Sequence, residues 1–167
     1  MDAFLADVAT TGTVLGAGLD RSPEQWQQTL GGAPLWVGET ALGLVQDYGL
    51  LEIHHLRGEQ AGTWRPFGFV IRTDRAETLT PTDVPPSLAT TYGPHPGPAF
   101  FAPLRAAVES AGHTLDPYVE FDSDTEAGIL RHRVRKTGVG ITVIARAESH
   151  GGFSDDQLYR VSRFLTN

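Results

Sequence analysis

The spacing of apolar residues predicts three helices before the last third of the chain. The first ten residues carry an apolar edge at helical spacing, which is typical of a short helix. A second helix, residues 22–31, is predicted because Ser22 and Gln25 form a capping box. Pro23 suits its first helical position, and Gly31 suits its C-terminal end. A third helix is expected over residues 99–112, where apolar residues recur at helical spacing.

Six segments have the length and composition of strands. They are residues 41–48, 50–56, 63–72, 116–121, 127–134 and 140–147. Within the second segment, strand alternation puts Leu51, Ile53 and His55 on one face. Glu52 and His54 share the opposite face. The short connections within each group of three segments favour two antiparallel, three-stranded meanders.

The C-terminal segment predicts a fourth helix. Ser154 and Gln157 repeat the capping-box pattern, and Leu158, Val161 and Leu165 form an apolar stripe at helical spacing. Together these elements predict an α+β fold, in which an antiparallel sheet of about six strands packs its helices on one face.

The chain length of 167 residues suits a single domain, residues 1–167. Residues 78–98 hold six of the eleven prolines, so we expect a long, proline-rich internal loop there. We do not expect a domain boundary at this loop, because neither flank is large enough for a core of its own.

Composition narrows the function mainly by exclusion. The formal net charge of −7 argues against nucleic acid, whose phosphates require a basic face. The chain has no cysteine, which excludes disulfides, cysteine nucleophiles and thiolate metal sites, and we predict no cofactor or metal. The N-terminus lacks the basic start of a signal peptide, and no apolar run is long enough to cross a membrane. We therefore expect a cytoplasmic protein.

The adjacent histidines, His54 and His55, raise the question of an active site. Neighbouring strand residues point to opposite faces, so the two cannot chelate one metal in a regular strand. Glu52 and His54 share a face and can act as a general base with its orienting carboxylate. The simpler interpretation is a polar pair on the exposed surface of a sheet.

An acidic run follows the third helix. Glu120, Asp122, Asp124 and Glu126 are spaced two residues apart, so an extended chain aligns them on one face. Three interpretations stay open: a solvated acidic turn, a cation site, and a patch that binds a basic partner. The EF-hand pattern is not met, because Ala127 stands where its glycine is required.

The only basic cluster lies just after the acidic run. Arg131, Arg133 and Arg135 face one way on a strand, and pairing with the acidic run explains them most simply. No sequence motif of a nucleotide-binding loop, a zinc protease or a serine hydrolase is present.

The segment Asp47-Tyr48-Gly49, which follows a helix ending in Leu-Gly and precedes an apolar-acidic strand, carries a family resemblance. Over about residues 15–72 the chain resembles small actinobacterial immunity proteins of polymorphic toxin systems. That resemblance implies a protein that neutralises a cognate toxin by binding it. The same residues also make structural sense, because Gly49 permits a turn and Asp47 can bind turn amides. The Tyr48 ring can pack while its hydroxyl reaches a polar partner.

We therefore predict a non-enzymatic protein-binding module, most specifically an immunity protein that occludes a toxin. Its predicted contact residues are Glu52, His54, Glu120, Asp122, Asp124 and Glu126, and the predicted partner is a basic toxin or another protein. The acidic charge also fits a role in solubility alone. Oligomeric state and the presence of catalysis stay open.

Two alternative functions stay open. The first is a small-molecule-binding or enzymatic domain with a pocket between the sheet and the proline-rich loop. Trp64, Tyr92, Phe100 and Phe101 are its expected lining, with Glu52, His54 or His95 as polar groups. The second alternative is a structural subunit, for which an exposed apolar patch is the diagnostic sign.

Overall fold

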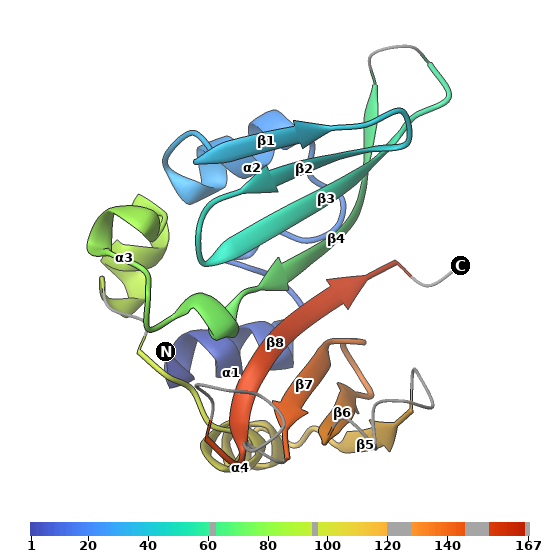
Figure 1. The fold of residues 1–167 in the computed structure, drawn as a ribbon. Coiled ribbons are helices and arrows are strands. Elements are labelled where there is room, and N and C mark those ends of the chain that lie inside the picture. Colours follow the sequence, from blue (N-terminus) through green and yellow to red (C-terminus); the bar gives the residue numbers. More distant parts are fainter. Residues whose placement is uncertain (61–62, 95–96, 120–127, 146–153, 166–167) are drawn as a thin grey trace.

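The computed structural model describes residues 1–167 except 61–62, 95–96, 120–127, 146–153 and 166–167 (Figure 1). The helices in the described part are α1 (Asp2–Thr11), α2 (Pro23–Leu30), α3 (Pro86–Tyr92) and α4 (Phe101–Ser110). The strands are β1 (Trp36–Glu39), β2 (Gly43–Asp47), β3 (Leu51–Arg57), β4 (Trp64–Ile71), β5 (Leu115–Tyr118), β6 (Ile129–Val134), β7 (Gly140–Ile144) and β8 (Gln157–Phe164). Two 3-10 turns, η1 (Thr73–Arg75) and η2 (Pro81–Asp83), lie between β4 and α3.

The strands form one antiparallel sheet in the order β1-β2-β3-β4-β8-β7-β6-β5. The predicted α+β class is confirmed, but the sheet has eight strands rather than about six. Each predicted three-stranded meander is a four-stranded one, and the two join where β4 pairs with β8. The additional strands are β1, which was not predicted, and β8, whose residues were predicted to form a helix.

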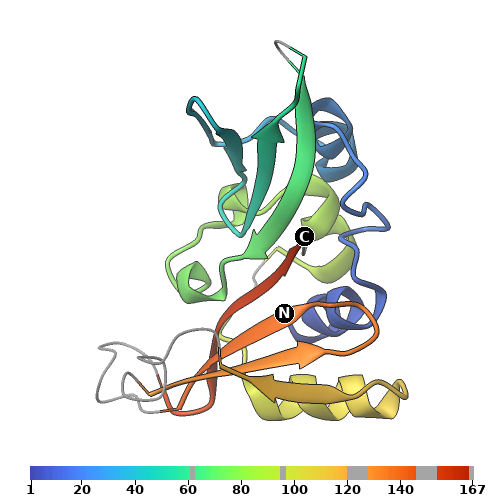
Figure 2. The same ribbon diagram turned by 90° about the vertical axis from the view of Figure 1, so that its right-hand side faces the viewer.

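The two halves of the chain repeat one arrangement. In each half two helices precede a four-stranded meander, and the last strands of the two meanders pair at the centre of the sheet. The helices cross between the halves, since α1 packs against α4 and α3 packs against α2. Figures 1 and 2 both show α1 beside α4. Neither half therefore completes its own core without a helix from the other.

One face of the sheet carries the core. Trp26 of α2 packs edge-on against Phe69 of β4, with ring centroids 6.4 Å apart. On the other half, Phe101 of α4 stacks on His132 of β6 at 4.4 Å. Both strand residues lie in register with core residues, Phe69 with Ile53 and His132 with Ile141. Helices from both halves thus cover the same face, as predicted, and the opposite face is left open.

The predicted C-terminal helix is wrong, because its residues form β8. A β-bulge explains the misleading pattern: Val143 pairs with Leu158, whereas Thr142 pairs with Arg160. The extra residue shifts the alternation by one, so Leu158 and Val161 both reach the core although they are three residues apart. Their spacing therefore imitates a helical stripe.

The proline-rich segment 78–98 contains regular structure in its described part. Pro81 begins η2 and Pro86 begins α3, so these prolines occupy the first helical positions, where a missing N–H has no cost. Leu88 of α3 is 2% exposed and belongs to the core. This part of the predicted loop is therefore a helical connection between the halves.

Candidate functional site on the open face of the sheet

The open face holds a hollow of about 470 Å³, a volume typical of ligand sites. Glu52 and His54 of β3 lie on one side, and Arg131, Arg133 and Arg160 lie on the other. Val70, Gly140, Thr142, Ser162 and Phe164 are among the residues that line the space between them. The hollow therefore spans both halves of the sheet across the β4–β8 junction.

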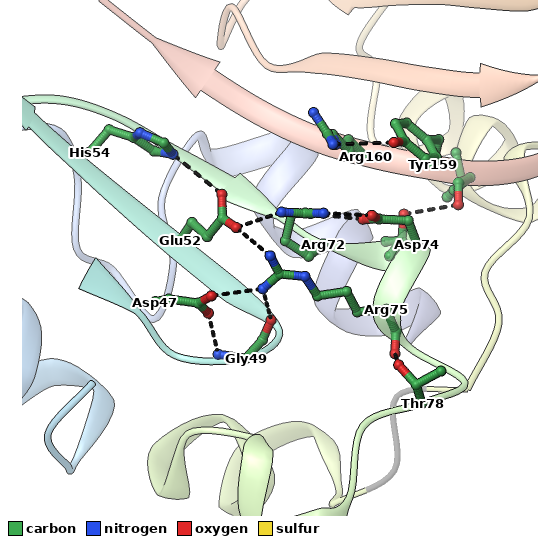
Figure 3. Close-up of polar contacts among 12 residues, drawn as sticks. Asp47, Gly49, Glu52, His54, Arg72, Asp74, Arg75, Thr78, Tyr159 and Arg160 are labelled. Carbon is green, nitrogen blue, oxygen red and sulfur yellow. Dashed lines mark hydrogen bonds and ion pairs between the residues drawn. The ribbon is translucent and has the colours of Figure 1, made fainter. Parts of the chain in front are cut away.

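Glu52 lies at the centre of an ion-pair network (Figure 3). Its Oε1 accepts hydrogen bonds from Arg72 at 2.5 Å and from Arg75 at 2.8 Å. Arg72 also donates two hydrogen bonds to Asp74, and Arg75 donates to Asp47 at 2.8 Å. The network joins the β2–β3 turn, β3 and η1, so it stabilises the arrangement of these three elements.

His54 lies at the edge of this network. Its Nε2 is 3.5 Å from Glu52 Oε2, which is an ion-pair distance but long for a hydrogen bond. His54 and the two arginines lower the pKa of Glu52 to about 2, against the effect of burial. Glu52 is therefore a permanent carboxylate at neutral pH and is unsuited to act as a general acid. The predicted Glu52–His54 pair does share the open face.

His55 faces the core, as strand alternation predicts. It is 2% exposed, and its Nε2 lies 3.3 Å from the side-chain oxygen of Gln46. Burial and the neighbouring His54 lower the pKa of His55 to about 4, although Glu24 opposes this. The two adjacent histidines are therefore chemically separate.

The β2–β3 turn has the predicted role for Asp47 but not for Tyr48. Asp47 Oδ1 accepts a hydrogen bond from the Gly49 N–H at 2.7 Å, and Gly49 has a φ of 78°. Tyr48 is 3% exposed, and its hydroxyl has no hydrogen-bond partner among the described residues. The expected polar partner for this hydroxyl is therefore not found in that part of the chain. Burial raises the pKa of Tyr48 to about 12.

Arg131, Arg133 and Arg160 form the arginine wall of the hollow, and the acidic run predicted to pair with the first two lies outside the described residues. Arg135 forms a bidentate pair with Asp116 at 2.8 and 2.7 Å, outside the acidic run. Arg133 lies over the Tyr118 ring at 4.6 Å, and Arg131 donates to the Thr142 hydroxyl at 3.3 Å. Arg160 completes the wall and was missed, because β8 was assigned to a helix.

A second, mainly apolar groove of about 420 Å³ lies over the first half. Trp36, Val45, Leu56 and Phe67 help to line it, and His54 borders both this groove and the 470 Å³ hollow. Phe67 reaches the open face at a register shift in the β3–β4 pairing. The groove was missed because β1 was not predicted.

Large apolar side chains are exposed on the β1–β2 hairpin next to this groove. Leu35, Trp36, Val37 and Leu42 are 58%, 60%, 50% and 79% exposed. The Trp36 indole lies over Gly38, where an added Cβ would collide with it. Their clustering on one edge of the sheet distinguishes them from scattered apolar surface residues.

Five of the predicted site residues lie outside the part of the chain that the structure describes. Glu120, Asp122, Asp124 and Glu126 lie outside the described residues, so their role in partner binding stays a prediction. His95 also lies outside them.

The aromatic residues of the predicted pocket are dispersed. Trp64 lies under Arg57 at the start of β4, whereas Tyr92 of α3 packs on Phe4. Phe101 stacks on His132 of β6, and Phe100 precedes α4. Two cavities near the proline-rich segment have volumes of about 40 and 10 Å³, enough for roughly one water molecule. These two cavities do not provide the expected ligand pocket.

Two features are absent from the described part of the chain. No group of three histidine or acidic side chains there is placed to hold a metal ion. No helix within the same residues is long and apolar enough to cross a membrane.

Comparison of the chain with protein-family models, curated proteins and solved structures finds no match.

Proposed function

We propose that this protein is a non-enzymatic protein-binding module that holds an extended segment of its partner along β1 and the adjacent apolar groove. The observation that carries the proposal is the cluster Leu35, Trp36, Val37 and Leu42, each at least half exposed on one hairpin. The register places Trp36 on the open face and Val37 on the opposite face, so this edge exposes apolar side chains on both faces of the sheet. Exposed apolar side chains gathered on one edge are typical of protein interaction sites.

The geometry of the two sheet edges favours β1 as the binding edge. β5, at the opposite edge, contains Pro117, which lacks the N–H needed to extend a sheet. β1 contains neither proline nor lysine. The Thr40 N–H donates a hydrogen bond to the Gly43 carbonyl of β2. In an antiparallel ladder, alternate residues direct their N–H and C=O groups toward and away from the partner strand. The N–H and C=O groups of Val37 and Glu39 therefore point away from β2, at the free edge of the sheet. An extended partner segment can pair with these groups while its side chains enter the groove.

An immunity protein that occludes a cognate toxin is the most specific form of this proposal. It is supported by the Asp47-Tyr48-Gly49 segment and the surrounding resemblance over residues 15–72. The test is co-purification with the products of neighbouring genes. Recovery of a secreted toxin in a stable complex supports this form, and a partner unrelated to toxins contradicts it.

The binding surface is tested with Trp36→Ser, which removes an exposed indole without opening the core. Leu130→Ser is the matched control, because Leu130 is 48% exposed on β6, near the other edge. We expect the tryptophan variant to lose the partner that the wild type captures, and the control to retain it. Equal capture by both variants contradicts the assignment. Sedimentation velocity of the protein alone shows whether the bound partner is a second copy of the chain.

A further inference from the structure

We propose that the 470 Å³ hollow on the open face binds a small ligand through an oxyanion, either a phosphate or a carboxylate, held by Arg133 and Arg160. This inference goes beyond the protein-binding proposal and does not depend on it, because the residues concerned lie on the second half of the sheet. It names a site that β1 and its apolar groove do not include.

The sheet register brings the cationic and hydroxyl groups together. Two rows of side chains cross β6, β7 and β8 on this face: Arg131, Thr142 and Arg160, and next to them Arg133, Gly140 and Ser162. Neighbouring strands lie about 4.8 Å apart, so the two outer members of a row are separated by about 10 Å at the backbone. Long arginine side chains on β6 and β8 can therefore converge on a ligand above β7.

The charge of the hollow is opposite to that of the whole chain. The chain has 20 acidic and 13 basic residues, yet the described residues that line the hollow include three arginines and one carboxylate, that of Glu52. Glu52 already binds Arg72 and Arg75, so it does not offset the charges of Arg133 and Arg160. Local positive charge in a concave site attracts anions despite the net negative charge.

The orientation of two arginines leaves donors for a ligand. Arg133 stacks over the Tyr118 ring at 4.6 Å, and stacking uses the face of the guanidinium while its N–H groups lie in the plane. Arg160 stacks on Tyr159 at 4.7 Å and donates one hydrogen bond, at 3.2 Å, to the hydroxyl of that tyrosine. A guanidinium has five N–H donors, so one such bond leaves capacity for an oxyanion.

Gly140 forms a low floor between these arginines. A Cβ at this position would lie 3.2 Å from the Tyr118 hydroxyl and 3.5 Å from the Ser162 hydroxyl. Two hydroxyl groups therefore converge where the glycine has no side chain. Hydroxyls can donate to the oxygens of a phosphate or carboxylate, and they add directional contacts to the charge of the arginines.

The site is tested by isothermal titration calorimetry of the full chain with inorganic pyrophosphate and, separately, with succinate. We expect one-to-one binding of at least one probe, weakening as salt is added. Arg133→Gln and Arg160→Gln should each weaken binding about tenfold or more, as expected for loss of a charged hydrogen bond. Binding of pyrophosphate alone identifies a phosphate site, and binding of succinate alone identifies a carboxylate site.

Arg105→Gln is the charge-matched control, because Arg105 pairs with Glu109 on the exposed surface of α4. It should change the affinity by less than about twofold, since it is remote from the hollow. Amide chemical shifts of the wild-type protein provide a measurement that needs no variant: each probe that binds should perturb Gly138, Gly140 and Ser162. Absence of saturable binding by both probes, an equal effect of Arg105→Gln, or shifts confined to the first half would overturn the proposal.

Discussion

At the scale of single residues, His55 is a titratable group held neutral in the core. Its ring is 2% exposed and packs on the same face as Leu51 and Ile53, with Gln46 as its polar contact. His54, one residue earlier, has the opposite environment on the open face beside Glu52. One step along a strand is therefore enough to separate a core residue from a candidate site residue.

The buried His55 predicts a loss of stability in acid. Its pKa is about 4 in the folded protein, below the ordinary value of 6.5, so the unfolded chain binds the proton more readily. The contribution of neutral His55 to the free energy of unfolding is fully present above pH 6.5. It is lost as the pH falls towards 4, and the loss amounts to roughly 3 kcal/mol. Urea unfolding between pH 7.5 and 4 measures it.

His55→Gln should remove most of this acid sensitivity, because glutamine cannot gain the proton. His113→Gln removes a histidine that is only half-buried and serves as the control. A wild-type protein whose stability is constant between pH 6.5 and 4 would contradict the assignment of a neutral His55.

At the scale of elements, two local contacts set the shape of the first half. The β2–β3 turn approaches η2 at Gly49, where an added Cβ would collide with the Asp83 carbonyl oxygen. The Glu52 network then holds the same turn to η1 through Arg72 and Arg75. The turn is thus fixed by its backbone conformation, by close packing and by charge.

Gly49→Ala should destabilise the fold more than Gly112→Ala. The two glycines have nearly equal φ angles of 78° and 76°, so both substitutions have the left-handed penalty of about 1 kcal/mol. A Cβ at Gly112 meets no atom within 4 Å, whereas one at Gly49 meets backbone, adding about 1–3 kcal/mol. Equal free energies of unfolding for the two variants would contradict the close approach of η2.

Glu52→Gln should lower the free energy of unfolding by about 2 kcal/mol, because it leaves two partly buried arginines without their shared carboxylate. Glu109→Gln breaks an exposed i,i+4 pair on α4 and should cost less than about 0.5 kcal/mol. Denaturant titration at neutral pH compares them. The difference should shrink as the pH falls from the ordinary glutamate pKa of 4.5 towards 2, where Glu52 itself becomes protonated.

At the scale of the whole molecule, the exchange of helices between halves makes the two meanders interdependent. α1 belongs to the first half but packs on α4, and α3 belongs to the second half but packs on α2. The central β4–β8 pairing adds a ladder between the halves. We therefore expect one cooperative unfolding transition.

The position of the tryptophans makes this testable. All three, Trp26, Trp36 and Trp64, lie in the first half, so their fluorescence reports that half alone. Leu104→Ala removes a core side chain of α4 in the second half and should cost about 2–5 kcal/mol. Its fluorescence and far-ultraviolet circular dichroism transitions should shift together. A fluorescence transition left at the wild-type position would show that the halves unfold independently.

Local pattern alone was enough to determine several elements and one feature of the candidate site. Ser22 and Gln25 do form the capping box of α2, and α4 ends at Ser110, two residues before Gly112, whose φ is 76°. Alternation in β3 correctly separated His55 from the pair Glu52 and His54. These features depend on contacts between residues that are close in the sequence, so the local sequence pattern is enough to predict them.

Only the tertiary structure decided the form of the C-terminal segment, and with it the arginine wall of the hollow. β8 lies between β4 and β7 in the sheet. Its partner β4 is far away in the sequence, and its pairing with β7 contains a bulge that only the register reveals. A single bulge makes Leu158 and Val161 imitate a helix and places Arg160 opposite Thr142. Strand pairing is non-local, and a shift of one residue exchanges the faces of a strand, so local periodicity could not determine which side chains of β8 lie on the open face.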